Sequence, residues 1–446
     1  MKALTFASSS NRSETRFDFI LGLQLQIGLF VSMAGIGVID GGAGGSDASS
    51  GSRQLIWGGM AVLTIGYLVA NSLAEGKRIF SYGSWWMATI LAYVSASISW
   101  SVDPGVTVKR SVLLAILVLV CSVTVGQRKQ NWRDDTFSRL LFTPMALLLA
   151  MSVLATLFMP RTAFTDIGWR GIASHKNEAG QMMAFATVLL LYGRCHAKLG
   201  SKTRTVLISL TLTALLLTKS TTALLGLVFG IGLTQAVTLR STLCRLGSWR
   251  VPVYIVAMIV FCGLFFGFQL DLLPSGQEIY TKLLNALGKS ETFTGRTAIW
   301  ELVLGESRFH NPWFGGGYGA FWVGRESISG YVLTGGGVLY PGQSHNGYID
   351  VYNDLGYVGL VIILLTIISW LIDVLKILHL GHPEGRLHLA IIFMCVFLNF
   401  GESTLLRGTG LLSIVFIASF IRTKAIVASS FKERRESRSR QAENLQ

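Results

Sequence analysis

A short polar segment late in the chain carries a side chain that could do acid–base chemistry. His345 stands among small and polar residues, in the run Pro341-Gly342-Gln343-Ser344-His345-Asn346-Gly347, where a ligand can approach the backbone closely. An accessible histidine can accept a proton at neutral pH, because its unperturbed pKa is about 6.5. His345 is therefore a candidate general base, although a lone histidine is more often structural than catalytic.

Basic side chains gather in a second polar segment, just before an apolar stretch. Arg170, His175 and Lys176 lie close together there, at the expected N-terminus of a helix. The free N–H groups and the positive end of the helix dipole would add to the charge of the two long cations. The pattern predicts an anion site that suits a phosphate, with interfacial snorkelling of the side chains as the alternative.

Two arginines in other segments are candidates for the same chemistry. Arg296 and Trp300 are four residues apart, so they share one face of an expected helix. An arginine fork contacts a phosphate through two donors, whereas lysine supplies a point charge. A surface ion pair with Glu301 or Glu306 is the alternative for Arg296. Arg110 begins an apolar stretch, where it either snorkels to the bilayer surface or faces a polar cavity.

The motifs of several other enzyme classes are absent. The chain has no GxxxxGK[ST] loop for ATP, no GxSxG nucleophile elbow and no HExxH metal motif. The segments expected outside the membrane contain no Asp-x-Asp motif. The five cysteines show no CxxC spacing and no grouping with histidine, so neither a disulfide framework nor a zinc site is expected. The sequence therefore predicts no metal and no cofactor.

The elements that must position these residues are membrane helices. Hydrophobic residues make up 51% of the chain and charged residues only 14%, against about 25% charged in a soluble domain. Apolar runs long enough to cross about 30 Å of hydrocarbon recur along it. The fold class is an all-α polytopic membrane protein. We expect about twelve spans, near residues 18–39, 55–74, 79–99, 107–126, 140–159, 178–194, 204–218, 220–239, 251–270, 346–375, 387–400 and 410–428.

The net charge of +14 sets the orientation of these spans. Alternate loops place 25 of the 38 lysines and arginines on one side of the membrane and 13 on the other. By the positive-inside rule the richer side is cytoplasmic, with both termini inside. The first span is interpreted as an uncleaved anchor rather than a signal peptide. Because most of the basicity sets orientation, we expect no nucleic-acid partner.

The same patterns divide the chain into four parts. Residues 1–270 hold spans one to nine with short loops, and residues 271–345 form one long periplasmic loop. Residues 346–428 hold spans ten to twelve. Residues 429–446 form a cytoplasmic tail, and its composition, rich in arginine, glutamate and serine, predicts disorder.

The long loop is the least ordinary of these parts, because a loop of that length without a role is uncommon. We expect it to be partly helical, with one helix near residues 275–287 and a second from 294 to about 307. A turn-rich, glycine-rich stretch follows at residues 311–321.

Four segments, in this order and on the external side, resemble the bacterial O-antigen ligase/polymerase superfamily, in particular its exopolysaccharide repeat-unit polymerases. Each motif is weak alone, but their order and the single long loop make the set fairly specific over roughly residues 95–410. The segments are Ser99-Trp100-Ser101-Val102-Asp103-Pro104; Trp169-Arg170-Gly171 with His175-Lys176-Asn177; Gly295-Arg296 with Trp300; and the glycine-rich segment followed by His345-Asn346.

The resemblance implies a lipid-dependent membrane glycosyltransferase of the bacterial inner membrane, with a periplasmic active site. Such enzymes take a glycan from an undecaprenyl-diphosphate carrier and join it to an acceptor glycan. His345 corresponds to the family's loop histidine and Arg296 to its loop arginine, as the catalytic pair. Arg170, with Lys176 nearby, corresponds to the basic residue at the mouth of span six. We expect a metal-independent single displacement that inverts the anomeric centre, with arginines in the place of a metal.

Further residues complete the expected site. His175, Arg110, Trp300 and Asn346 are candidate substrate-binding residues. Glu402 departs from the strict family pattern and is a candidate second acid or base, or a ligand of sugar hydroxyls. Surfaces for sugar stacking, with packing inside the loop as the alternative, are offered by Trp313, Phe314, Tyr318, Phe321 and Trp322.

Other functions stay open at this stage. A ligase would transfer finished glycan to lipid A-core oligosaccharide and shares every motif named above. A twelve-span transporter is disfavoured, because the spans hold few ionisable groups and show no two-fold repeat. A structural scaffold for polysaccharide export is the third alternative. Polysaccharide export or chain-length proteins are further candidate partners of the enzyme, beside the lipid bilayer.

Overall fold

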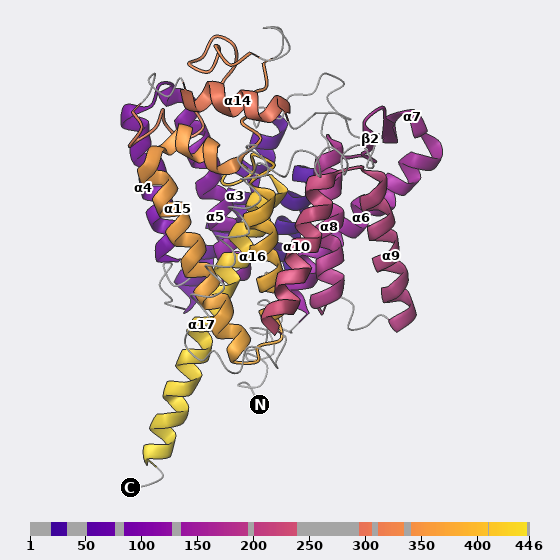
Figure 1. Cartoon of the computed structure of the whole chain (residues 1–446). Helices are drawn as coiled ribbons and strands as arrows, with labels where there is room; N and C mark the ends of the chain where they lie inside the picture. Colours follow the sequence, from indigo (N-terminus) through magenta and orange to yellow (C-terminus); the bar gives the residue numbers. More distant parts are fainter. Residues whose placement is uncertain are drawn as a thin grey trace.

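The protein is a bundle of helices that run side by side (Figure 1). The computed structural model describes residues 19–33, 51–75, 84–126, 135–194, 200–238, 294–305, 311–333, 340–408 and 410–443. Helix α14 (Thr294–Gly305) lies across one end of the bundle, and the last helix, α17 (Leu411–Glu443), extends beyond the opposite end (Figure 1).

The described residues are mostly helical. A two-residue antiparallel hairpin, in which Phe164 pairs with Trp169, is the one sheet among them. In chain order the elements are the helix Phe19–Met33, α3 (Gly51–Glu75), α4 (Trp85–Ala96), one turn of 3₁₀-helix (Ser97–Trp100), α5 (Pro104–Val125), α6 (Thr136–Phe158), α7 (Pro160–Ala163), β1 (Phe164–Thr165), β2 (Gly168–Trp169), α8 (Lys176–Tyr192), α9 (Ser201–Leu217), α10 (Thr221–Thr238), α14, α15 (Gly347–His379), α16 (Gly385–Leu398) and α17.

The architecture is that of a polytopic membrane protein. Within the described residues, five helices are long and apolar enough to cross a membrane, namely α5, α6, α10, α15 and the apolar part of α17. Eleven of the twelve expected spans coincide with a helix. The ninth, at residues 251–270, lies outside the described residues. The helical membrane class is thus confirmed, and the count of twelve stays a prediction.

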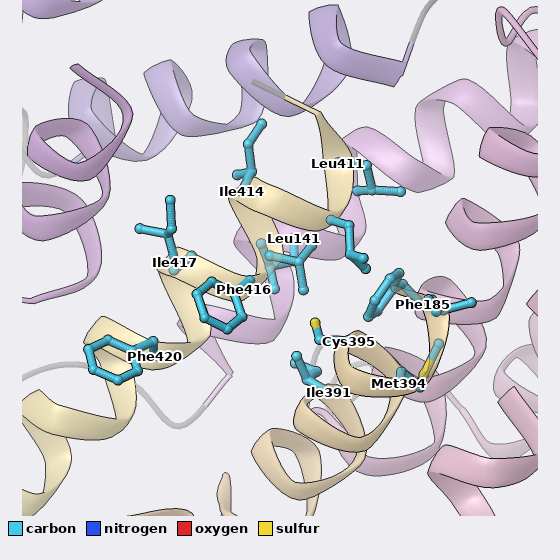
Figure 2. Packing of buried hydrophobic residues seen from close by; sticks show 14 of the residues in the cluster. Leu141, Phe185, Ile391, Met394, Cys395, Leu411, Ile414, Phe416, Ile417 and Phe420 are labelled. Atoms are coloured by element: carbon cyan, nitrogen blue, oxygen red, sulfur yellow. The ribbon is translucent and has the colours of Figure 1, made fainter. Parts of the chain in front are cut away.

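Helix α16 is the centre of the bundle. Every residue of it except Arg386 is buried, and it packs against α8, α10, α15 and α17. A helix that is apolar all round is expected to be enclosed by other helices. Figure 2 shows Ile391 and Cys395 of α16 close to Phe416 of α17 and to Leu141 of α6. The segment that follows α16 is therefore anchored to the core of the protein.

Helix α15 is broken at Gly356, which has a φ of 66° and a ψ of −167°. Left-handed φ values are strained for residues with a side chain, so glycine suits this position. A Cβ added at Gly356 would lie 2.3 Å from the carbonyl carbon of Trp313. The break separates a nine-residue helical piece, residues 347–355, from the longer piece that is expected to cross the membrane.

The glycine-rich segment of the long loop supplies the hydrogen bonds that α15 loses at its break. The N–H of Tyr357 donates to the carbonyl of Pro312 (2.9 Å), and the N–H groups of Gly316 and Gly317 donate to the carbonyls of Asn353 (2.8 Å) and Asp354 (2.9 Å). Buried backbone groups must be paired, above all near a membrane, so the loop and the broken helix require each other.

Two parts of the long loop have the expected structure. The helix expected from residue 294 to about 307 is α14, Thr294–Gly305, and turns follow in the stretch 311–321. The helix expected near residues 275–287 lies outside the described residues.

The expectation of a disordered tail is wrong for the described part of residues 429–446. Helix α17 continues to Glu443. Neither proline nor glycine occurs between Leu411 and Glu443. Because adding residues to a formed helix is far easier than nucleating one, a helix anchored in the bundle propagates into its polar continuation.

Replacing Gly356 with alanine tests the break in α15. We expect Gly356→Ala to lower the free energy of unfolding by about 2 kcal/mol or more, because the new methyl group meets the backbone of Trp313 in a strained conformation. The measurement is the midpoint of thermal unfolding in detergent.

The matched control is Gly232→Ala in α10, where a Cβ meets no atom within 4 Å. This control should unfold at the wild-type temperature or slightly above it, since alanine favours helix over glycine. Equal midpoints for Gly356→Ala and the control would show that the break places no demand on residue 356.

Candidate functional site

The carboxylate of Glu402 joins three segments that are distant in the sequence. Its Oε1 accepts a hydrogen bond from Asn177 Nδ2 at 2.6 Å and lies 3.5 Å from Arg296 Nη2. Its Oε2 lies 4.0 Å from His345 Nδ1. We call Glu402, Asn177, Arg296 and His345 the Glu402 cluster. The two residues expected to form the catalytic pair, Arg296 and His345, thus share one carboxylate.

Each member of the Glu402 cluster stands at the end of a helix or in a short connection. Asn177 is in the first turn of α8, Arg296 is in the first turn of α14, and His345 precedes α15. Glu402 follows the central helix α16. Helix ends and connections leave side chains free to converge, while the helices behind them hold the backbone in place.

Burial makes these partners necessary. The side chain of Glu402 is only 10% exposed, and that of Arg296 is 19% exposed. A charge removed from water is tolerated only when it is paired and hydrogen-bonded. Gly401 permits the approach, because a Cβ there would lie 2.6 Å from Thr222 at the start of α10 and 3.4 Å from Arg296 Nη1.

His345 has a strained backbone and a ring with two partners. Its φ of 53° is left-handed, which is uncommon for a residue with a side chain and is often found at functional sites. Nδ1 lies 3.2 Å from Gln343 Nε2 as well as 4.0 Å from Glu402. Both partners lie on the Nδ1 side of the ring, and the side chain is 29% exposed.

Asn346 and Trp300 hold the backbone around His345. The Asn346 carboxamide oxygen caps α15 by accepting from the N–H groups of Tyr348 (3.0 Å) and Ile349 (3.3 Å). Asn346 is fully buried, and Trp300, 3% exposed, donates its Nε1–H to the carbonyl of Ser344 at 2.7 Å. Both were expected to contact substrate, and this arrangement suits positioning of the neighbouring His345.

The three basic residues at the start of α8 lie beside the Glu402 cluster. His175 is the N-cap of α8, and its Nδ1 accepts from the N–H of Asn177 at 3.2 Å. Lys176 Nζ donates to the carbonyl of Ile167 at 3.0 Å. Arg170 donates from Nε to the carbonyl of Thr162 and from Nη1 to that of Ser174. These contacts hold the small hairpin and place three basic groups at one helix N-terminus.

The electrostatic setting of His175 links this group to the Glu402 cluster. Burial lowers the pKa of the His175 ring, Glu402 raises it, and Lys176, His345 and Arg170 lower it. Part of the ring stays open to solvent. The net direction is downward, which keeps the ring neutral and preserves Nδ1 as the acceptor that caps α8.

Arg110 contacts the long loop, and its role in substrate binding stays a prediction. Its Nη1 donates to the carbonyl of Gly319 in the glycine-rich segment. Arg110 also interacts electrostatically with Asp354 of α15, and no interaction with Glu402 is described for it. It supports the loop that completes α15.

The five loop aromatics that were candidates for sugar stacking divide into two groups. Tyr318, Phe321 and Trp322 are at most 5% exposed and belong to the packing of the protein. Trp313 and Phe314 are 61% and 44% exposed, at the place where the loop meets the break in α15. Only these last two retain surface for stacking.

Four residues of this region were not singled out from the sequence. They are Asn177, Gln343, Asp350 and Arg407. Beside His345, Arg407 donates a hydrogen bond to Gln343 and forms an ion pair with Asp350 at 3.5 Å. The spacing of Asp350 could have indicated its place beside this region. It follows Asn346 by four positions, so the two residues share one face of a helix.

Comparisons with known proteins agree with the motif pattern. Residues 206–364 match a family model described as O-antigen ligase. The chain is also 25% identical over 313 residues to the exopolysaccharide production protein ExoQ of Rhizobium meliloti (strain 1021), with 67% of each chain covered. These matches support the O-antigen ligase/polymerase superfamily and confirm the resemblance. The family match includes Arg296 and His345, whereas Asn177 and Glu402 lie outside it.

The cap formed by His175 should make the start of α8 sensitive to pH. Because the pKa of His175 in the folded protein is below its ordinary value of about 6.5, stability is complete above about pH 6.5 and declines as pH falls through the lowered pKa. We expect the midpoint of thermal unfolding to drop between about pH 7.5 and about pH 5.5. His175→Asn should reduce that drop, because asparagine caps helices and does not titrate.

His175→Ala is the companion variant. It removes the cap acceptor and should lower stability by about 1 kcal/mol at both pH values. An unchanged pH sensitivity in His175→Asn would mean that other groups cause the acid destabilisation.

Proposed function

We propose that this membrane enzyme of the O-antigen ligase/polymerase type polymerises repeat units of an exopolysaccharide or O-antigen. The donor is an oligosaccharide on undecaprenyl diphosphate, and the acceptor is a sugar hydroxyl of a second glycan at the periplasmic face. The observation that supports this most is the Glu402 cluster, which unites a histidine, an arginine and a carboxylate at one end of a membrane bundle.

In the proposed reaction His345 is the general base. The acceptor hydroxyl oxygen attacks the anomeric carbon of the donor, and its proton passes to the imidazole. The bond between that carbon and the phosphate oxygen breaks, so undecaprenyl diphosphate leaves. Attack opposite the leaving group inverts the anomeric centre. Glu402, 4.0 Å from Nδ1, orients the ring and stabilises the imidazolium, as a carboxylate does behind a catalytic histidine.

The leaving diphosphate carries the main electrostatic demand. Negative charge that develops where water is scarce is stabilised by fixed cations. Arg296 lies within the Glu402 cluster, and Arg170 and Lys176 stand beside it at the N-terminus of α8. We propose that these side chains bind the diphosphate without a metal ion. The N-terminus of α8 adds its positive dipole end.

The proposed enzyme lies in the bacterial inner membrane. Its active site faces the periplasm, and both termini lie in the cytoplasm. The arginine-rich end of α17 projects from the end of the bundle opposite α14 (Figure 1). Cytoplasmic segments carry the excess of lysine and arginine, so α14 and the Glu402 cluster belong on the other side.

Ligation to lipid A-core oligosaccharide is the alternative that the comparisons keep open. The family model is described as O-antigen ligase, whereas the curated relative is named for exopolysaccharide production. Both reactions use the same donor and the same leaving group. They differ only in the acceptor glycan.

A transporter is less well supported. Three buried ionisable side chains lie together away from the Glu402 cluster. Glu384 accepts two hydrogen bonds from Arg422, at 2.7 Å and 3.0 Å, and lies 3.2 Å from His388 Nε2. These side chains satisfy one another and tie α17 to the start of α16. They form an internal clamp rather than an open ion site.

The product formed from a defined lipid-linked repeat unit tests the function. Purified protein in proteoliposomes should convert that substrate into a ladder of longer lipid-linked glycans. Transfer to added lipopolysaccharide core, without a ladder, would establish the ligase instead. No glycan transfer, together with substrate-dependent proton or sodium flux, would establish the transporter.

His345→Ala tests the proposed base in the same assay. We expect the rate of chain extension to fall by about 10²- to 10⁴-fold, the usual contribution of a general base. His379→Ala, at the exposed last turn of α15 on the opposite side of the membrane, is the matched control and should extend chains at the wild-type rate. Wild-type extension by a folded His345→Ala protein would remove His345 from the mechanism.

A further inference from the structure

The side chain of Gln343 lies between Arg407 and His345. Its Oε1 accepts from Arg407 Nη1 at 2.8 Å, and its Nε2 lies 3.2 Å from His345 Nδ1. Arg407 also donates from Nη2 to the carbonyl of Gly342 at 2.8 Å. The guanidinium group thus binds two consecutive residues, Gly342 and Gln343, of the segment that contains His345.

Arg407 is itself held in place. Leu406, just before it, has a left-handed φ of 54°, and the Tyr318 hydroxyl donates to the Leu406 carbonyl. Asp350 Oδ2 lies 3.5 Å from Arg407 Nη1. A buried hydrogen bond from Trp322 Nε1 at 2.8 Å fixes the other oxygen of Asp350. The position of the guanidinium is therefore set by the packed loop.

These contacts determine the orientation of the Gln343 carboxamide. Arginine can only donate hydrogen bonds, so the carboxamide oxygen must face Arg407. The NH₂ group must then face His345 and donate to Nδ1. A neutral imidazole that accepts at Nδ1 carries its proton on Nε2.

Glu402 favours the opposite state of the same nitrogen. A carboxylate can only accept, so a hydrogen bond between His345 and Glu402 requires a proton on Nδ1. Gln343 is the nearer of the two, at 3.2 Å against 4.0 Å. The resting arrangement therefore satisfies Gln343 first.

We propose that Arg407 and Gln343 are positioning residues that decide which nitrogen of His345 carries the proton. They hold the neutral ring with its proton on Nε2. When Gln343 moves away, Nε2 releases a proton to water and Nδ1 takes one from water, with no net change in charge. Glu402 then binds the Nδ1–H, and the unprotonated Nε2 can accept a proton from substrate.

The role of this proton position in catalysis rests on the proposed function. The assignment of the His345 proton to Nε2 does not. As a base, His345 must present an unprotonated nitrogen to the acceptor, and Gln343 and Glu402 both occupy the Nδ1 side. Only the tautomer selected by Glu402 leaves Nε2 ready. On this proposal, the structure corresponds to the state before Nε2 of His345 is free to accept a proton.

The experiment is ¹⁵N NMR of the full chain in nanodiscs with ¹⁵N-labelled histidine, about two pH units above the ordinary pKa of histidine. The His345 signals are identified by their loss in His345→Gln. In the wild type we expect Nδ1 to have the chemical shift of an unprotonated nitrogen and Nε2 that of a protonated one. In Gln343→Glu, whose carboxylate can only accept, Nδ1 should become protonated.

Variants of Arg407 separate positioning from folding. Arg407→Gln should partly shift the proton to Nδ1, because the Gln343 carboxamide can then turn over, whereas Arg407→Lys retains a donor and should keep the wild-type pattern. Arg139→Gln removes an arginine of α6 that pairs with Asp135, just before this helix, and should leave His345 unchanged.

Two results would overturn the inference. One is a protonated Nδ1 in the wild type, and the other is an unprotonated Nδ1 in folded Gln343→Glu. Neither result depends on glycan transfer. If the protein gives the expected NMR spectra but does not polymerise the substrate, the proposed function is rejected. The role of Gln343 and Arg407 is then retained.

Discussion

The buried carboxylate of Glu402 joins the segments that make up the candidate site. Glu402 is almost enclosed, so its charge must be met by donors from elsewhere in the chain. Asn177, Arg296 and His345 supply that compensation from three different segments. Removing one partner of a buried charge typically costs about 3–5 kcal/mol. The same requirement that stabilises the fold therefore holds the side chains of the proposed catalytic pair together.

The membrane imposes a second constraint, which the long loop resolves. Helix α15 breaks at Gly356, and unpaired backbone groups at this buried position would be expensive. The glycine-rich segment pairs them, so the loop is bonded to the bundle through main-chain contacts. The piece of α15 before the break is capped by Asn346, the residue next to His345. The break thus allows one continuous chain to supply both a membrane span and a wall of the site.

The helices could be predicted from the sequence, because each long apolar run must either be buried in the protein or span the membrane. The positions of His345 and Arg296 at helix boundaries followed from the same patterns. Their meeting at Glu402 did not, since the partners are separated by 106 residues for Arg296 and 225 for Asn177. Residue type shows what a side chain can bind, and it does not show where its hydrogen bonds are already used. Trp300 and Asn346 illustrate this, because both bind the backbone beside His345.

A double-mutant cycle tests most directly whether Glu402 and His345 act as one unit. The rate of chain extension from a defined lipid-linked substrate is measured for wild type, Glu402→Gln, His345→Ala and the double variant, each checked for folding. If the carboxylate works through the imidazole, the double variant should be close to His345→Ala alone, because the second loss removes an interaction already gone. Losses that multiply across the two variants would contradict the account, since the two side chains would then act independently.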